Sequence, residues 1–384
     1  MTDLVSRVRR RLATDPPTDS AELDDVVRDE AEVIADDAAF VELRRDVEAE
    51  LTGAGPLEAL LALAGVTDVL VNGPDAVWID RGHGMERTPV TFADDAAVRR
   101  LAQRLACAAG RRLDDAMPFV DAALPDGTRL HAVLPPLTAR TTMSLRVLAR
   151  ERHDLADLVR LGAMSGPVAG VLDAIVAARL AFVISGGTGT GKTTLLGALL
   201  GQTPAGERLL VIEDAAELVI EHPHLVRLVT RACNVEGMGA VGLRDLVRLA
   251  LRMRPDRLVV GEFRGAEMIE LLVALNTGHE GGAATLHANS ARDVPARFVA
   301  LGGLGGLPAP AVTTLVASAV DVVVHLRRGR DGRRIVDEVG LLSRAGDELS
   351  VASVWSVRTG IGVAAPRLAA LIADRAQVVP ELLR

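Results

Sequence analysis

The sequence contains few aromatic residues and few cysteines. Tyrosine is absent, and two tryptophans and six phenylalanines bring the aromatic content of the 384 residues to only 2%. Surfaces that bind single-stranded nucleic acid use aromatic side chains on which the bases stack, and such platforms are scarce here. The two cysteines, Cys107 and Cys233, form no Cys-x-x-Cys pair. This spacing argues against a zinc site and a disulfide framework, and it fits a reducing compartment.

Long apolar runs and an excess of positive charge are also missing. The longest uncharged run, residues 298–320, contains "LGGLGGLPAP", which has too much glycine and proline for a membrane-spanning helix. It predicts a helix end, a loop and a second helix. Residues 1–19 show no apolar core of a signal peptide. The net charge of -8 gives the chain as a whole no attraction to nucleic acid or anionic lipid.

Lysine is the scarcest charged residue. Of the 43 lysine and arginine residues only Lys192 is a lysine, which leaves 42 arginines. Lys192 belongs to "GGTGTGKT", which satisfies G-x-x-x-x-G-K-[ST], follows an apolar strand at 181–184 and precedes a helix, as a phosphate-binding loop must. A compact ammonium fits a cradle of backbone N–H groups better than a planar guanidinium does. We expect Lys192 to be an exposed loop side chain at this site.

The motif predicts a set of residues that bind the nucleotide and, through the threonine after the lysine, Mg²⁺. The predicted nucleotide-binding residues are Gly186, Gly187, Thr188, Gly189, Thr190, Gly191, Lys192, Thr193 and Thr194.

The N-terminal part of the chain predicts a helical segment followed by a small α+β domain. Residues 1–50 are acidic, with apolar residues at helical spacing. Residues 51–150 contain short apolar strands separated by "NGPD" and "RGHG", which predict a β-meander, then a helix and two further strands. We expect the second of these stretches to form a domain of its own.

The remainder of the chain predicts an α/β domain. Residues 151–175 read as a linker and a helix. Five apolar stretches within 176–345 alternate with helical segments, which favours a parallel sheet covered on both faces. Residues 346–384 are taken as a C-terminal tail. Hydrophobic residues make up 49% of the chain, enough to build the cores of two or three domains.

Carboxylates follow two of the predicted strands. Glu262 comes just after the strand at 258–260, where it is placed to hold Mg²⁺ through water, and Glu213, Asp214 and Glu217 follow another strand. The alternative is that these carboxylates cap the next helices. The residue that polarises the attacking water is either Glu213 or Glu217, and the pattern leaves the choice open.

Two histidines stand on either side of a short predicted strand. His279 and His287 in "GHEGGAATLH" bracket a glycine-rich turn and a strand. Their position beside a nucleotide-binding sheet favours a functional role and an ordinary structural role about equally. The segment "EHPH" at 221–224 lacks a third ligand for a metal and is read as a loop.

As a set, the motifs resemble a known family. "GGTGTGKTT", "IEDAAEL", "RMRPDRLVVGEFRG" and "NTGHEGGAATLHANS" occur in the order found in secretion ATPases of type II and type IV systems. Upstream, "VTDVLVNGP" and "PFVDAALPDGTRLHAVLPP" look like the N-terminal domain of the tight-adherence (Flp) pilus branch, with links to conjugal transfer. The resemblance covers residues 50–345 and implies a RecA-like P-loop ATPase domain after a smaller α+β domain.

The resemblance also implies roles for individual residues. Lys192 and Thr193 would hold phosphates and Mg²⁺, and Glu262 would be the Walker B acid. Glu217 or Glu213 would be the catalytic base. The remaining implied residues are the γ-phosphate sensors His279 and His287 and the arginines Arg129 and Arg146, which would close over the phosphates. After Arg146 the chain reads "VL" where the family usually has "KF", so the neighbouring contacts differ.

The family resemblance implies a cytoplasmic enzyme that uses ATP and Mg²⁺. It would form a homo-oligomer, a hexamer, held at the inner membrane by platform proteins of a pilus or secretion system. The expected function is ATP hydrolysis that powers pilus assembly or protein secretion. One alternative is a conjugative or nucleic-acid-translocating motor, for which the basic run "HLRRGRDGRR" is the weak argument. The other is a nucleotide-gated scaffold with vestigial hydrolysis.

Overall fold

The computed structural model describes residues 53–384 except 83, 148–151, 232, 234–237, 330, 347 and 377, together with isolated positions before residue 53. The helical segment predicted for residues 1–50 therefore lies almost wholly outside the described residues. The chain divides into two compact units, Met1–Ala149 and Arg150–Arg384, and each is described by itself.

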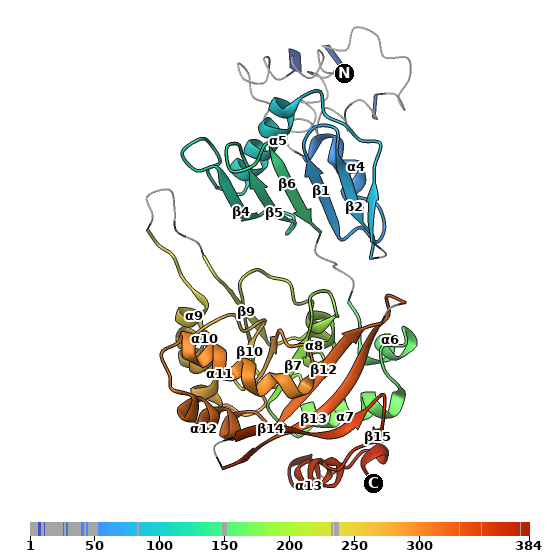
Figure 1. The fold of residues 1–384 in the computed structure, drawn as a ribbon, viewed down its shortest axis with the longest axis vertical. Helices are drawn as coiled ribbons and strands as arrows, with labels where there is room; N and C mark the ends of the chain where they lie inside the picture. The colour runs from blue at the N-terminus through green and yellow to red at the C-terminus, as the bar shows by residue number, and fades with distance from the viewer. Residues whose placement is uncertain are drawn as a thin grey trace. The chain divides into compact units, whose positions relative to one another are not determined.

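The first unit is built on a six-stranded antiparallel sheet with strand order β3-β2-β1-β6-β5-β4 (Figure 1). The predicted meander forms its first three strands. The strand bounds are β1 (Asp68–Asn72), β2 (Val77–Asp80), β3 (Met85–Arg87), β4 (Phe119–Ala123), β5 (Arg129–Val133) and β6 (Thr142–Arg146).

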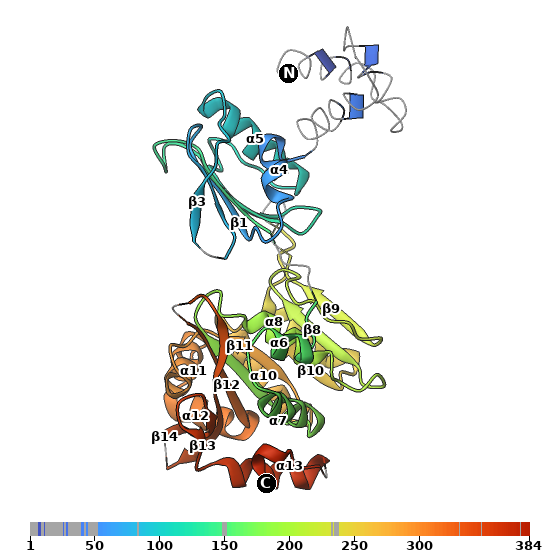
Figure 2. The same cartoon turned by 90° about the vertical axis from the view of Figure 1, so that its right-hand side faces the viewer.

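Helices cover one face of this sheet (Figure 2). They are η1 (Gly55–Leu57), α4 (Glu58–Leu61) and α5 (Asp95–Ala108). The side chain of Asp94 caps α5 by accepting a hydrogen bond from the N–H of Ala97, which fixes where the helix begins. Val98, Leu101 and Leu105 recur at helical spacing and are buried in the core that α5 shares with the sheet.

Alternation along the strands leaves the other face of the sheet polar. In β6 the buried residues are Met143 and Leu145, while Arg146 points the opposite way and is exposed. Arg146 pairs across the sheet with Asp68 of β1 and with Arg129 of β5. Directly opposed residues in antiparallel strands point to the same face, so these three side chains form one row.

The second unit contains a nine-stranded mixed sheet with strand order β15-β14-β13-β12-β7-β11-β10-β8-β9. The run from β12 to β9 is parallel, and β13, β14 and β15 extend it with antiparallel pairings. The strand bounds are β7 (Phe182–Gly186), β8 (Leu209–Glu213), β9 (Leu225–Val229), β10 (Arg257–Val260), β11 (Ala283–Leu286), β12 (Val322–Arg328), β13 (Arg334–Ala345), β14 (Glu348–Ser356) and β15 (Gly360–Ile361).

Two separate cores lie on the two faces of this sheet (Figures 1 and 2). One face is covered by α6 (Leu155–Arg160), α7 (Gly166–Ala177), α8 (Lys192–Leu200), α13 (Ala365–Ala376) and η4 (Glu381–Leu383). The other face is covered by α9 (Leu243–Ala250), η2 (Leu251–Met253), α10 (Glu267–Leu275), η3 (Ala291–Asp293), α11 (Val294–Leu304) and α12 (Ala309–Ala319). Strands β7, β8 and β10 are buried along their whole length, as central strands covered on both faces must be.

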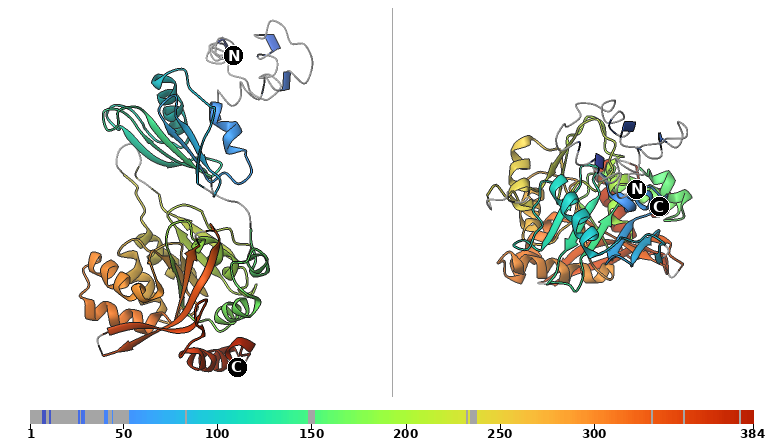
Figure 3. Two further views of the ribbon diagram at one scale, coloured as in Figure 1. Left: turned by 45° about the vertical axis from the view of Figure 1, so that its right-hand side comes forward. Right: turned by 90° about the horizontal axis from the view of Figure 1, so that it is seen from above.

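The prediction of an α/β fold is confirmed, and three details of the second unit differ from the expectation. The sheet is mixed rather than parallel. Of the linker and helix predicted for residues 151–175, the helix is α7, but the stretch before it forms α6, which buries Leu158 in the core. Residues 346–384 are no separate tail: β14 pairs with β13, and α13 packs on α7 and β14 (Figure 3). Leu368 and Ile372 of α13 are fully buried.

The uncharged run 298–320 forms the end of α11, a turn and α12, as its composition predicts. Among the described residues, no helix is both long enough and apolar enough to cross a membrane.

Candidate functional site

The phosphate loop, residues 186–193, connects β7 to α8. Gly191 precedes the first residue of α8 with φ 92°, and Gly189 has φ 71°, backbone conformations that glycine adopts without strain. Gly186 is needed for space: a Cβ atom there would lie 2.6 Å from the carbonyl oxygen of Leu326 and 2.7 Å from Oγ1 of Thr190. The loop thus presents the N-terminus of α8, an anion-binding position, at the carboxyl end of β7.

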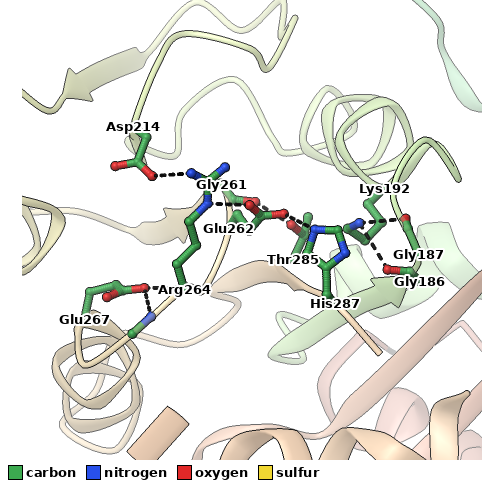
Figure 4. Close-up of polar contacts among 11 residues, drawn as sticks. Gly186, Gly187, Lys192, Asp214, Gly261, Glu262, Arg264, Glu267, Thr285 and His287 are labelled. Atoms are coloured by element: carbon green, nitrogen blue, oxygen red, sulfur yellow. Dashed lines mark hydrogen bonds and ion pairs between the residues drawn. The ribbon is translucent and has the colours of Figure 1, made fainter. Parts of the chain in front are cut away.

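Lys192 is buried inside this loop rather than exposed, so the expectation of an exposed side chain is wrong. Only 7% of the residue is exposed. Its Nζ donates hydrogen bonds to the carbonyl oxygens of Gly186 at 3.1 Å and Gly187 at 3.0 Å (Figure 4). Burial lowers the pKa of Lys192, and the negative charge of Glu262 partly offsets that effect. The ammonium is therefore held by the curl of the loop itself.

Glu262 follows β10 and is held on both carboxylate oxygens (Figure 4). Its Oε1 lies 2.9 Å from Nε2 of His287, and its Oε2 accepts a hydrogen bond of 2.6 Å from Nε of Arg264. Arg264 also reaches Asp214, with 3.3 Å between Nη1 and Oδ2. One chain of charges thus joins the loops after β8, β10 and β11.

The electrostatics of this chain keep Glu262 ionised. Burial acts to raise the pKa of Glu262, but the hydrogen bond and charge of Arg264, with smaller contributions from His287 and Lys192, outweigh it and leave the pKa below its usual value. The influence of Lys192 shows that the phosphate loop and Glu262 interact electrostatically. A charged carboxylate facing the phosphate loop suits an Mg²⁺ site.

Glu213 and Glu217 lie in different surroundings. Glu213 ends β8, is 4% exposed, and its Oε1 accepts hydrogen bonds from the backbone N–H groups of Glu217 at 2.9 Å and Leu218 at 2.8 Å. Its Oε2 lies 3.2 Å from Nε of Arg227, an ion pair without the angle of a hydrogen bond. Burial raises the pKa of Glu213 against these contacts. Glu213 therefore anchors the acidic loop, residues 213–218, while Glu217 is only partly buried.

The two predicted histidines are not brought together. His287 follows the carboxyl end of β11 and contacts Glu262. His279 precedes the amino end of the same strand, and its Nδ1 lies 3.2 Å from the carbonyl oxygen of Ala274 at the end of α10. Because β11 runs parallel to β7, the phosphate loop lies at the edge where His287 stands. His287 therefore stands at the phosphate-loop edge of the sheet, and His279 stands at the opposite edge.

The two predicted arginines of the first unit are neighbours. Arg129 and Arg146 are cross-strand partners of β5 and β6, and Nε of Arg146 donates a 3.0 Å hydrogen bond to Oδ1 of Asp68. Sequence separation gave no hint of this pairing.

Sequence reasoning missed Arg264 and a buried Ser185–His325 pair. Arg264 was visible only as an arginine two residues after Glu262. Ser185 of β7 and His325 of β12 are register partners, with 2.9 Å between Oγ and Nδ1. Burial lowers the pKa of His325, and the backbone of Asn289 also hydrogen-bonds this histidine. The available signal was a histidine within the apolar stretch "VVVHL". Through Ser185 and Asn289, His325 connects the strand before the phosphate loop to the loop that carries His287.

The strand–loop–helix with its buried lysine, together with an ionised carboxylate at the end of β10, which is separated from β7 by β11 alone, is the site of a P-loop ATPase. Sequence comparison then gives the family. The chain belongs to the type II/IV secretion system protein family, whose sequence profile matches residues 50–348.

Individual relatives agree with this membership, and a solved structure has a similar fold. A Mycobacterium tuberculosis H37Rv protein assigned by name to conjugal transfer is 54% identical over 339 residues, 86% of this chain and 96% of the relative. The type IV secretion system protein PtlH of Bordetella pertussis is 32% identical, covering 73% and 92%. The ADP-bound pilus retraction motor PilT matches with a TM-score of 0.53 at 20% identity, covering 73% and 80%. This last likeness concerns the fold alone.

Proposed function

We propose that this protein hydrolyses ATP with Mg²⁺ to power pilus assembly or protein secretion across an inner membrane. The observation that carries the hydrolysis is the meeting of Lys192, Glu262 and His287 at the carboxyl edge of one sheet. Membership of the type II/IV secretion family supports the coupling to a machine.

The residues fit the roles that this reaction needs. The backbone of 186–194 and Lys192 hold the phosphates. The hydroxyl of Thr193 would supply an oxygen ligand to Mg²⁺, and the carboxylate of Glu262 would hold the ion through water. Glu217 acts on the attacking water, because the buried Glu213 is committed to two backbone N–H groups and Arg227. His287 reads the terminal phosphate through its contact with Glu262.

The same proposal gives Arg129 and Arg146 a part in hydrolysis. Their pairing on the polar face of the first sheet supports joint action on phosphate charge. We expect single alanine substitutions at the two positions to lower the turnover number more than they weaken ATP binding. Normal turnover in both variants would remove these arginines from the proposal.

The assembly proposed is a homo-hexamer in the cytoplasm, held at the inner membrane by platform proteins. Pilus assembly of the tight-adherence kind rests on the resemblance of residues 66–74 and 118–136 to that branch. Light scattering with and without ATP tests the hexamer, and co-purification with membrane proteins encoded beside the gene tests the partners.

A second candidate is a motor for conjugal transfer, favoured by the name of the 54% identical relative. The two functions differ in their response to DNA. Under the first, the rate of phosphate release is unchanged by single-stranded DNA. A several-fold increase in that rate, lost as salt is raised, would favour the conjugative motor.

The central test is phosphate release by Glu262→Gln across a range of Mg²⁺ concentrations. The matched control is Glu280→Gln, which neutralises an exposed carboxylate before β11, at the opposite edge of the sheet. We expect the first variant to lose metal-dependent turnover and the control to keep it. Equal turnover in parent and Glu262→Gln would contradict the assignment, and a parent that releases no phosphate would indicate a nucleotide-gated scaffold.

A further inference from the structure

The hairpin of β12 and β13 lies directly against the phosphate loop. Leu326 of β12 is the register partner of Gly186, and its carbonyl oxygen is the atom that leaves no room for a Cβ at that glycine. Leu326 also contributes Cδ2 at 4.0 Å from the Cβ position of Gly191. The loop is thus bounded on one side by this hairpin.

Arg334, the first residue of β13, reaches the same glycine. A Cβ atom at Gly191 would lie 3.5 Å from Cδ of Arg334 and 3.9 Å from its Cβ. The aliphatic stem of Arg334 therefore lies on the residue that precedes α8, and its guanidinium begins one bond beyond that contact. Gly191 has no side chain that would hold the guanidinium away from the phosphate-binding N–H groups.

The charge of Arg334 has no partner within the residues that the structure describes. Arg327 in the same hairpin pairs with Asp337, and Arg333 pairs with Asp331, but the side chain of Arg334 forms no hydrogen bond or ion pair there. An exposed arginine thus stands beside the N-terminus of α8 and close to Lys192. These three positive features favour an anion between them.

The strand order decides which part of a nucleotide Arg334 would meet. Glu262 and His287 follow β10 and β11 on one side of β7, whereas β12 and β13 lie on its other side. The metal and terminal-phosphate end of the site is on the β10–β11 side. Arg334 is therefore placed for the part of the nucleotide that ATP and ADP share.

We propose that Arg334 is a nucleotide-binding residue that contacts the phosphates nearest the ribose and takes no part in cleavage of the terminal phosphate. This role rests on ATP binding as part of the proposed function. Uniform binding of substrate and product predicts a raised KM, an unchanged turnover number, and equal losses of affinity for ATP and ADP.

The test compares Arg334→Ala with Arg333→Ala by titration with a fluorescent ADP analogue, competition with unlabelled ATP, and steady-state phosphate release. Arg333 is the matched control, since it is the adjacent exposed arginine and pairs with Asp331. We expect Arg334→Ala to weaken ADP and ATP binding about fivefold to fiftyfold, the effect of one partly screened charge-assisted hydrogen bond. Arg333→Ala should bind ADP and ATP within about twofold of the parent affinity, and both variants should have the melting temperature of the parent.

Three results would overturn the assignment. One is parent-like ADP binding by Arg334→Ala. The second is a loss of turnover number with unchanged ADP affinity, which would place Arg334 in the cleavage step. The third is an equal loss in Arg333→Ala, which would reflect the general field of the hairpin. A parent chain that binds neither nucleotide would instead remove the proposed function, so the two failures are distinguishable.

Discussion

Glutamine and alanine substitutions at Glu213 test whether this residue holds the acidic loop while Glu217 acts on the attacking water. Glutamine keeps an oxygen where the N–H groups of Glu217 and Leu218 donate, whereas alanine leaves both donors without their acceptor. An unsatisfied buried donor costs about 1–3 kcal/mol. Glu217 is only partly buried, so water can partly replace the acceptor for its N–H group. The loss of both hydrogen bonds should therefore lower the free energy of unfolding by about 2–5 kcal/mol.

Loss of the charge itself should cost little. The pKa of Glu213 is raised because burial outweighs the hydrogen bonds and the attraction of Arg227. The folded chain therefore binds this proton more tightly than the unfolded chain does. The stability contributed by Glu213 is fully present below the pKa of the unfolded side chain, about 4.3, and is lost as pH rises through the higher folded pKa. The parent should accordingly lose stability relative to Glu213→Gln as pH rises through that window.

Thermal unfolding and phosphate release measure the two effects. One kcal/mol shifts the melting midpoint of a unit of this size by about 2–4 °C, so Glu213→Ala should melt about 4–20 °C below the parent. Glu213→Gln should melt within about 2 °C of the parent and still hydrolyse ATP. Glu217→Gln should fold normally and lose hydrolysis.

Two results would refute this reasoning. If Glu213→Ala has the melting temperature of the parent, the hydrogen bonds to Glu213 do not hold the loop. If Glu213→Gln folds but releases no phosphate while Glu217→Gln stays active, Glu213 is the residue that acts on water.

Further predictions concern the phosphate loop and its buried neighbour. Lys192→Arg keeps the charge but places a larger side chain in a site that is only 7% exposed. The variant should lose most ATPase activity and about 1–3 kcal/mol of stability through overpacking. Phosphate release and a melting temperature equal to those of the parent would contradict this. Gly186→Ala should abolish binding in an ADP titration, because its Cβ would lie 2.6 Å from the oxygen of Leu326. Burial lowers the pKa of His325 in the folded chain. As pH falls, this histidine is therefore protonated in the unfolded chain before the folded one, and the free energy of unfolding should decrease below about pH 6.5. Melting curves at several pH values should show this loss in the parent and a smaller one in His325→Gln.

The parts of the site that come from neighbouring sequence could be predicted. The phosphate loop, Glu262 and the strand before each of them follow from local patterns, because an apolar run and a glycine-rich turn report on their own backbone. All five predicted strands of the second unit occur in the structure. The strands β4, β9, β13, β14 and β15 were missed. For β4 and β9 the reason is that "FVDAA" and "LVRLV" show neither strict alternation nor a long apolar run.

The contacts across the sheet could not be predicted. The contacts of Glu262 with His287 and of Arg264 with Asp214 depend on the order of β8, β10 and β11, and a single sequence does not encode that order in any local pattern. The separation of His279 from His287 could not be predicted for the same reason. Two histidines eight residues apart look alike in a sequence, but a strand between them separates their side chains to opposite edges of the sheet.

The pairing of β13 with β14 affects how this chain tolerates truncation. Strand β13 is twelve residues long, and β14 covers its outer edge over most of that length. A chain that stopped at residue 345 would keep every residue of the ATP site and would expose that edge. Unpaired backbone N–H and C=O groups on a long edge strand are a template for association between copies. A shortened protein of this kind should therefore aggregate, although its chemistry lies entirely in the part that remains.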